Sequence, residues 1–243
     1  MSRLDIFLTN EKRYASRARA QRAIREGLVS VNGIVIKKAS YEVAPGAFVE
    51  SAPDPVPFVS RGALKLQGAL AFYHLEVEGK KCLDVGASTG GFTQVLLDSG
   101  AAAVTAVDVG HDQLNLVLRE DPRVTSLEGM DIRCLPLCQY KNQFDLVSID
   151  VSFISLRCVL PAVFCYMKPA AACVALVKPQ FELGSAALNK KGIVKEPRLL
   201  PKAVARVRAF AEECGFAVEG IQESPIKGGD GNTEFLMLLT KIG

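Results

Sequence analysis

The sequence predicts an α/β protein in which a small α+β domain precedes a larger domain built on a mainly parallel sheet. After residue 58, apolar strand-like segments alternate with helix-like segments, as in a parallel sheet covered by helices. Before residue 51, two short helices lead into a hairpin instead. The stretch "SAPDPVPF" at 51–58 has three prolines in eight residues and indicates a linker. We therefore expect domains at 1–50 and 59–243, and 243 residues suffice for one full core plus a smaller one.

The first domain is expected to hold two short helices and a small sheet. On a helix that begins near Ser16, the side chains of Ala20, Ala23 and Ile24 share one face, which would pack on the core of the domain. In "VSVNGIVI" at 29–36, Asn-Gly stands between β-branched residues, which is a strong hairpin signal.

Positive charge is concentrated in this first domain. Residues 1–50 contain nine Lys and Arg against five acids, whereas the remainder contains 20 against 21. A solvated surface is the plain alternative, but solvated helices usually mix both signs, and the second helix has few acids. The asymmetry favours a polyanionic partner. The side chains expected to contact it are Arg17, Arg19, Arg22, Arg25, Lys37 and Lys38.

These residues resemble the S-four module, a small RNA-binding domain of ribosomal and RNA-modifying proteins. The likeness covers about Arg3–Glu50 and rests on "RLD" at 3–5, the alanine-rich second helix and "VNG" at 31–33. The resemblance implies that the first domain binds structured RNA.

The second domain is expected to contain seven strands, the last two joined by a loop alone and paired antiparallel at the sheet edge. The expected strands lie near Lys81–Ala87, Ala103–Asp108, Val124–Met130, Phe144–Asp150, Ala172–Lys178, Ala217–Glu223 and Glu234–Lys241. The expected helices lie near Arg61–Tyr73, Gly91–Asp98, Asp112–Arg119, Ser155–Met167 and Arg198–Glu213.

A glycine-rich turn follows the first of these strands in "CLDVGASTGGFTQVLL" at 82–97. Glycines allow close backbone approach to a ligand, and the helix that follows presents free N–H groups at its start. The spacing differs from the G-x-G-x-x-G of dinucleotide-binding proteins. It resembles the D-x-G-x-x-x-G turn of S-adenosylmethionine (SAM) methyltransferases. The resemblance implies a class I SAM-dependent methyltransferase fold with a seven-stranded, Rossmann-like sheet, and it places Asp84 where it would offset the methionine ammonium.

Two further acids end the next two strands. Asp108 could accept hydrogen bonds from both ribose hydroxyls of SAM, and Asp131 stands where such enzymes often contact the adenine amine. Each alone could simply cap a loop. Acids at successive strand ends beside a glycine turn favour a ligand, because ligands bind at the carboxyl edge of such sheets. The residues expected to hold the cofactor are Asp84, Gly86, Ser88, Thr89, Gly90, Gly91, Phe92, Asp108 and Asp131.

Four charged residues stand in short motifs that point to the reaction. They are Lys65 in "SRGALKL", Asp150 in "SIDVSF", Lys178 in "LVKPQFE" and Glu234 in "GNTEFL". With both domains in order, the chain resembles the TlyA (hemolysin A) family, which is related to the FtsJ-type ribose 2′-O-methyltransferases. The resemblance implies that these four residues form the catalytic Lys–Asp–Lys–Glu tetrad. Lys178 would accept the hydroxyl proton, Asp150 would orient Lys178, and Glu234 would hold Lys65 or the ribose.

The resemblance also implies the substrate, which is cytidine in ribosomal RNA or a ribosomal subunit. With little chain outside the two domains, we expect the shorter family type, which modifies large-subunit RNA. A membrane-active hemolysin and a non-catalytic RNA-binding protein are the alternatives. No apolar run is long enough to span a bilayer, and no signal peptide is evident, so we expect a cytoplasmic protein without stable membrane association. Seven cysteines without a CxxC pair and two histidines give no zinc pattern, and we expect no metal.

Overall fold

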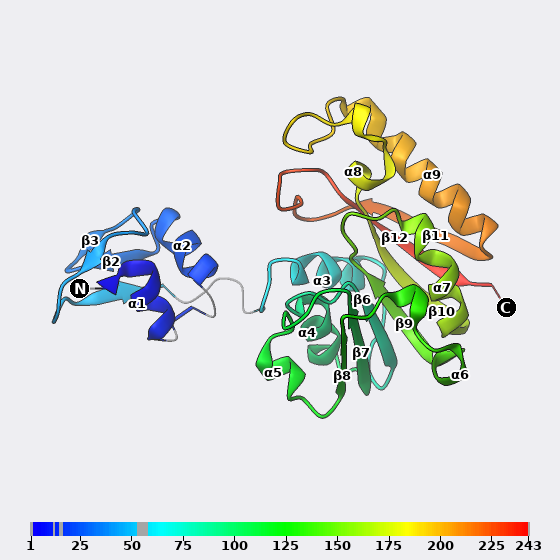
Figure 1. The fold of residues 1–243 in the computed structure, drawn as a ribbon, viewed down its shortest axis with the longest axis horizontal. Helices are drawn as coiled ribbons and strands as arrows, with labels where there is room; N and C mark the ends of the chain where they lie inside the picture. The colour runs from blue at the N-terminus through cyan, green and yellow to red at the C-terminus, as the bar shows by residue number, and fades with distance from the viewer. Residues whose placement is uncertain (1, 12, 15–16, 53–57, 243) are drawn as a thin grey trace. The chain divides into compact units, whose positions relative to one another are not determined.

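The computed structural model describes residues 2–11, 13–14, 17–52 and 58–242. The chain divides into two compact units, Met1–Pro57 and Phe58–Gly243, and each is described here by itself (Figure 1). The predicted linker at 51–58 falls mostly on residues 53–57, which lie outside the described residues, as does Ser16 at the expected start of the second helix.

The N-terminal unit packs two helices against short antiparallel strands. Its elements are β1 (Ser2–Arg3), α1 (Leu4–Asn10), α2 (Arg17–Arg25), β2 (Val29–Val31), β3 (Ile34–Val35), β4 (Glu42–Val43) and β5 (Val49–Ser51). The expected hairpin is confirmed: β2 pairs antiparallel with β3, and Asn32 and Gly33 in the turn both have positive φ. Ala20, Ala23 and Ile24 of α2 are buried in the core of this unit, as predicted.

The C-terminal unit is built on one seven-stranded sheet, in the order β11-β12-β10-β9-β6-β7-β8. The strands are β6 (Lys81–Val85), β7 (Ala103–Asp108), β8 (Val124–Glu128), β9 (Phe144–Ile149), β10 (Met167–Val177), β11 (Phe216–Glu223) and β12 (Phe235–Lys241). Neighbours from β8 to β10 are parallel. β12 lies antiparallel between β10 and β11, which confirms the predicted pairing of the last two strands and leaves β11 at the edge.

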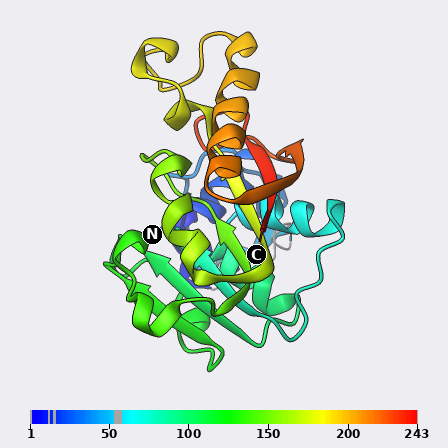
Figure 2. The same cartoon turned by 90° about the vertical axis from the view of Figure 1, so that its right-hand side faces the viewer.

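Helices cover both faces of this sheet. Leu83 and Val85 of β6 face a core shared with α7 (Leu160–Tyr166) and α9 (Leu200–Glu213), which lie toward the viewer in Figure 2. The alternate residue Asp84 faces the other way, where Thr93 of α4 (Gly91–Asp98) donates to it. α3 (Ala63–Phe72) packs beside α4 on that face. Of the helices in the described residues, none combines the length and apolar character that crossing a bilayer requires.

Several elements have other bounds than the sequence pattern suggested. The segment expected as a helix at 155–167 is a 3₁₀ turn, η2 (Leu156–Cys158), followed by α7, because Pro161 fits only the first turn of a helix. Pro201 likewise stands in the first turn of α9. The helix expected from Asp112 is only α5 (Leu116–Arg119), because the amides of residues 112–114 donate to the Glu128 carboxylate instead. β10 begins earlier than expected and is irregular between Met167 and Ala172.

Candidate active site

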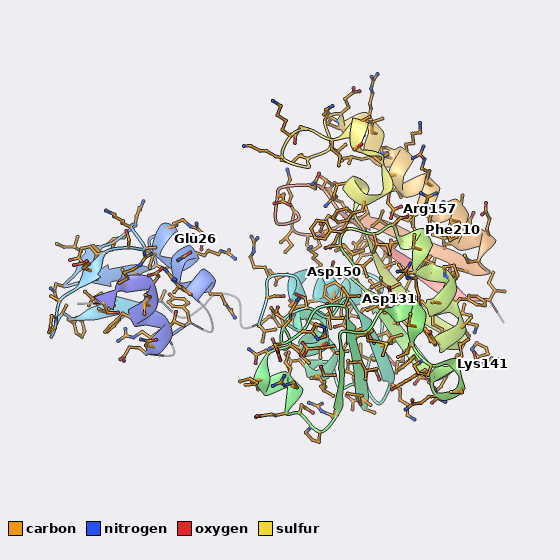
Figure 3. The ribbon with its side chains drawn as sticks, in the orientation of Figure 1. Glu26, Asp131, Lys141, Asp150, Arg157 and Phe210 are labelled. Atoms are coloured by element: carbon orange, nitrogen blue, oxygen red, sulfur yellow. The ribbon has the colours of Figure 1, made fainter. Side chains whose placement is uncertain are left out.

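Two adjoining cavities open at the carboxyl ends of the parallel strands. The larger, of about 350 Å³, runs past the ends of β7 and β8 and is lined by Asp108, Met130 and Asp131. The smaller, of about 200 Å³, is lined by the glycine turn, by Ser60 and by Lys178. Both are lined by the same four residues where they meet: Gly86, Ser88, Asp150 and Ser152. The two cavities therefore form one continuous site, with Asp150 between its halves; Figure 3 labels Asp150 and Asp131, which both line the larger cavity.

The glycines of the turn make room mainly for protein atoms. Gly86 has φ 84°, and a Cβ there would collide with the backbone carbonyl of Asp150. A Cβ at Gly91 would collide with the Ser60 hydroxyl at the entry to α3. Of the residues predicted to hold the cofactor, Gly86, Ser88, Thr89, Gly91 and Phe92 do line a cavity. The turn is thus packed directly against two other segments, one at Asp150 and one at Ser60, and this packing fixes its position beside Asp150.

Asp84 lies one layer beneath the cavities. It is fully buried, and its carboxylate accepts from Thr93 Oγ1 at 2.7 Å and from Ser148 Oγ at 3.0 Å. Burial raises the pKa of Asp84 to about 6, although both hydroxyl hydrogen bonds oppose the rise. Any influence on a bound cation would act from beneath the turn rather than by direct contact.

The other two predicted acids do line the larger cavity. Asp108 ends β7 and accepts from the amides of Ser88 and Gly110 at 2.8 and 2.7 Å, which fixes its carboxylate against the turn. Asp131 caps the next segment and pairs with Arg133 at 2.6 Å. That hydrogen bond lowers the pKa of Asp131, so the side chain remains an acceptor.

Lys178 and Asp150 form a largely buried ion pair on the wall of the smaller cavity. Lys178 Nζ lies 2.6 Å from Asp150 Oδ1, in a geometry not aligned as a hydrogen bond, and donates to Ser152 Oγ at 2.8 Å. Lys178 follows the last residue of β10, and Asp150 follows the last residue of β9. Because β9 and β10 are parallel neighbours, the two side chains meet at the same edge. A buried lysine held by two oxygens keeps one position of its ammonium group.

Lys65 and Glu234 form a second buried pair. Lys65 Nζ donates to Glu234 Oε2 at 2.6 Å, with the side chains 9% and 3% exposed. This contact joins α3 to the residue just before β12 across 169 positions of sequence. The structure thus groups the four predicted residues into two ion pairs, Lys178–Asp150 and Lys65–Glu234. Their catalytic roles remain a prediction.

Sequence reasoning missed two aromatic residues beside the Lys178–Asp150 pair. Phe153 is 92% exposed, has φ 64° and lines the larger cavity. Its ring lies 5.3 Å from that of Phe181, which follows Lys178 in α8 (Pro179–Glu182). A large apolar side chain held outward in a strained conformation is uncommon and points to a functional position. The sequence did offer one indication, because "VSF" at 151–153 directly follows Asp150, where a loop is expected.

Two of the predicted RNA-contacting arginines have acidic partners in the N-terminal unit. Arg17 Nε donates to the fully buried Asp5 at 2.9 Å, and Arg22 donates to Glu26 at 2.7 Å (Figure 3 labels Glu26). The expectation that α2 has few acids to pair its cations is therefore wrong for these two. Arg25, Lys37 and Lys38 are exposed, and Arg19 is half-buried.

Comparisons with known proteins agree with both units. A family described as FtsJ-like methyltransferase matches residues 58–241, and the S4 domain matches residues 2–49. A Mycobacterium tuberculosis protein, named 16S/23S rRNA (cytidine-2′-O)-methyltransferase TlyA, is 42% identical over 98% of this chain and 89% of its own. Hemolysin A of Brachyspira hyodysenteriae is 37% identical over 96% of this chain and 98% of its own. The chain belongs to the TlyA family of FtsJ-like methyltransferases.

Solved structures support the same assignment to the TlyA family. A Streptococcus thermophilus protein that was solved under a hemolysin name is 41% identical, covers 99% of this chain and 88% of its own, and has a TM-score of 0.79. A Burkholderia thailandensis N1-methyltransferase, solved with S-adenosylhomocysteine, is 18% identical and covers 76% of this chain and 80% of its own, with a TM-score of 0.55. That second likeness shows the fold alone, which is that of SAM-dependent methyltransferases.

Proposed function

We propose that this protein is a SAM-dependent ribose 2′-O-methyltransferase that acts on cytidine in ribosomal RNA. The observation that carries the proposal is the buried Lys178–Asp150 pair, which lies where the two cavities meet. The activity in the names of the TlyA relatives supports it. On this proposal the protein works in the cytoplasm, where its RNA substrate is found, and modifies large-subunit RNA.

The residues that line the larger cavity fit SAM. Asp108 lines the cavity and is held by two amides, one on each carboxylate oxygen, so each oxygen keeps the capacity to accept from a ribose diol. Asp131 stays a carboxylate and could accept from the adenine amine. Met130 and Ile132 supply apolar lining between them for an adenine ring. When bound, SAM supplies a methyl group already activated on a cationic sulfur.

The protein must then place a ribose hydroxyl and take up its proton. A 2′-hydroxyl is a weak nucleophile near neutral pH, so an aligned proton acceptor raises the rate. On this proposal Lys178 Nζ is that acceptor: its ammonium first releases a proton to solvent, and the resulting amine takes the hydroxyl proton, while Asp150 and Ser152 fix its position from two sides. The Lys65–Glu234 pair holds the start of α3 against the residue that precedes β12. The exposed Phe153 ring offers a stacking face at the cavity rim for the base of the target nucleotide.

Methylation of ribosomal subunits tests the proposal. Purified protein is incubated with SAM and subunits from a strain lacking the gene, and nucleosides are then analysed by mass spectrometry. The expected product is 2′-O-methylcytidine in large-subunit RNA. Methylation of a base, or no methylation of either subunit, would refute the assignment. A liposome leakage assay with the same protein tests the membrane-active alternative, which predicts leakage.

Cofactor binding gives an independent prediction. Asp108→Ala should weaken SAM binding in calorimetric titration by about 1–3 kcal/mol, because a fixed charged acceptor is lost. Asp98→Ala, which removes an exposed carboxylate at the end of α4, is the matched control and should leave the affinity unchanged. Equal SAM affinities of the two variants would show that Asp108 does not contact the cofactor.

A further inference from the structure

A basic arm of the C-terminal unit follows α8 and reaches into the first turn of α9. We define the basic arm as residues 184–202, drawn in yellow in Figure 1. It contains five cations and one acid, Glu196, whereas the rest of residues 58–243 contains fifteen cations and nineteen acids. All five cations are exposed: Lys190, Lys191, Lys195, Arg198 and Lys202. Positive charge in this unit is therefore concentrated on one loop of an otherwise acidic body.

The basic arm has a defined shape. Asn189 Oδ1 accepts from the amides of Lys191 and Ile193 at 2.8 and 3.0 Å, which closes a turn, and Leu188 pairs with Val194 below it. The turn presents Lys190 and Lys191 at its tip. Arg198 pairs with Glu196. In the described part of the chain, no carboxylate lies within ion-pair distance of Lys190, Lys191 or Lys202, so their charges are available to a partner.

A buried amide attaches the basic arm to the active site. Asn232 is 3% exposed, accepts from the Val194 amide at 3.1 Å and donates to the Gly192 carbonyl at 3.0 Å. Asn232 stands two residues before Glu234, the partner of Lys65. The arm also begins shortly after α8, whose first residue follows Lys178. The chain that enters the arm from α8 comes from Lys178, and the hydrogen bonds of Asn232 tie the arm to the segment that contains Glu234.

We propose that the basic arm is a second RNA-binding site, which contacts the phosphates of the strand entering the active site. This inference rests on the proposed function and adds a surface on the catalytic unit itself. Lysines attract phosphates as mobile point charges without reading sequence, so they suit a guiding role. Attachment through Asn232 would place that guidance next to Glu234, where the target nucleotide must be held.

The test replaces Lys190, Lys191 and Lys202 together by Gln in the full chain. A control variant replaces two exposed lysines, Lys81 and Lys141, by Gln at the opposite, amino edge of the sheet; Figure 3 shows Lys141 beside α6 (Leu137–Tyr140), away from the arm. Binding to subunits from a strain lacking the gene is measured without SAM at several salt concentrations. The arm variant should bind about tenfold more weakly, with a salt slope shallower by about two to three units, because each lost phosphate contact removes one counterion-release term.

A charge-conserving variant and SAM titration complete the test. Changing the same three lysines to Arg should restore the affinity, and all variants should bind SAM as the unaltered protein does. If the Gln variant binds RNA like the control, or if the Arg variant fails to restore binding, the basic arm is not a phosphate site. If the unaltered protein methylates no subunit, the proposed function fails, whereas the arm's effect on binding is still read directly.

Discussion

At the scale of single residues, the site depends on carboxylates that have been taken out of water. Asp84 has no exposed surface, and its pKa of about 6 lies above the ordinary value of 3.8 because burial disfavours the charged form. The folded protein therefore binds this proton more tightly than the unfolded chain does. Ionisation of Asp84 lowers the free energy of unfolding as pH rises from about 4 to about 6, by about 3 kcal/mol at most.

Asp84→Asn should remove this pH-dependent loss. The amide has nearly the same shape and can hydrogen-bond to both Thr93 and Ser148, whose hydroxyls can turn. Relative to the unaltered protein, the variant should gain up to about 3 kcal/mol in unfolding free energy between pH 4 and pH 7, measured by denaturant titration at each pH. Asp98→Asn changes an exposed neighbour on α4, and its unfolding free energy should differ from that of the unaltered protein by the same amount at every pH. If the difference for Asp84→Asn is also independent of pH, the ionisation of Asp84 is not coupled to folding.

The second residue-scale prediction concerns the proton acceptor. Lys178→Ala and Lys178→Arg should both lower the single-turnover rate of methyl transfer by about 100-fold or more, since a guanidinium stays protonated and cannot take the proton. SAM and RNA affinities should be unchanged.

Lys168→Arg is the control, because Lys168 pairs with Asp145 at 2.6 Å at the other end of the same two strands. Substantial activity of Lys178→Arg would assign Lys178 a purely electrostatic role.

At the scale of elements, the alternation of strands and helices predicted the sheet well, because the apolar residues that marked these segments in the sequence are the ones that the structure buries. β7 and α4 have the bounds that the pattern gave, and the antiparallel strand pair followed from a connection that contains a loop and no helix. The pattern failed where a local contact outweighs it. Glu128 captures the amides expected in a helix, and prolines decide where α7 and α9 begin. The Glu128 contacts join residues 14 to 16 positions apart, which a local window does not contain, whereas the prolines are local signals that the sequence displays.

Another long-range contact positions the loop that follows β9. Glu182 of α8 is 4% exposed and accepts from Ser155 Oγ at 2.6 Å and from the Leu156 amide at 2.8 Å. It thus ties the loop that contains Asp150, Ser152 and Phe153 to the helix that follows Lys178.

Loss of this brace should affect stability and turnover together. Glu182→Ala leaves the buried Leu156 amide without a partner and should cost about 1–3 kcal/mol, seen in denaturant unfolding. It should also lower turnover at temperatures where the variant is folded, whereas Glu182→Gln, which keeps an acceptor, should recover most of the rate. Glu212→Ala, an exposed pair with Arg208 on α9, should change neither. Full activity of folded Glu182→Ala would show that the loop needs no brace.

At the scale of the whole molecule, the residues expected to bind RNA and those expected to catalyse methyl transfer lie mainly in different units. Net positive charge lies in the N-terminal unit, while the four predicted catalytic residues lie in the C-terminal unit. The motifs and the family resemblance predicted the four charged residues and the partnership of Asp150 with Lys178, but they left Glu234 with either Lys65 or the ribose as its partner; the structure shows the pair with Lys65. The position of Phe153 after Asp150 marked it as a loop residue, but its exposure depends on a backbone conformation that sequence does not display.

Charge reversal in the N-terminal unit tests this division. Arg25, Lys37 and Lys38 are exposed, whereas Arg17 is held by Asp5 and Arg22 by Glu26, so the first three are the cations to change. Replacing them with Glu should weaken binding to ribosomal subunits by tenfold or more and make its salt dependence shallower. SAM affinity and turnover at saturating subunit concentration should stay as they are, because the residues predicted to bind SAM and to catalyse the transfer all belong to the C-terminal unit.

The same number of reversals on the C-terminal unit, at Lys81, Lys141 and Lys227, separates this effect from a general change in net charge. Those three lysines are exposed, so the control changes the net charge equally without touching α2 or the hairpin. Equal loss of RNA affinity in both triple variants would mean that only total charge matters. Unchanged affinity in the N-terminal variant would mean that α2 and the hairpin carry a solvated surface, and RNA recognition would then rest on the catalytic unit and its basic arm.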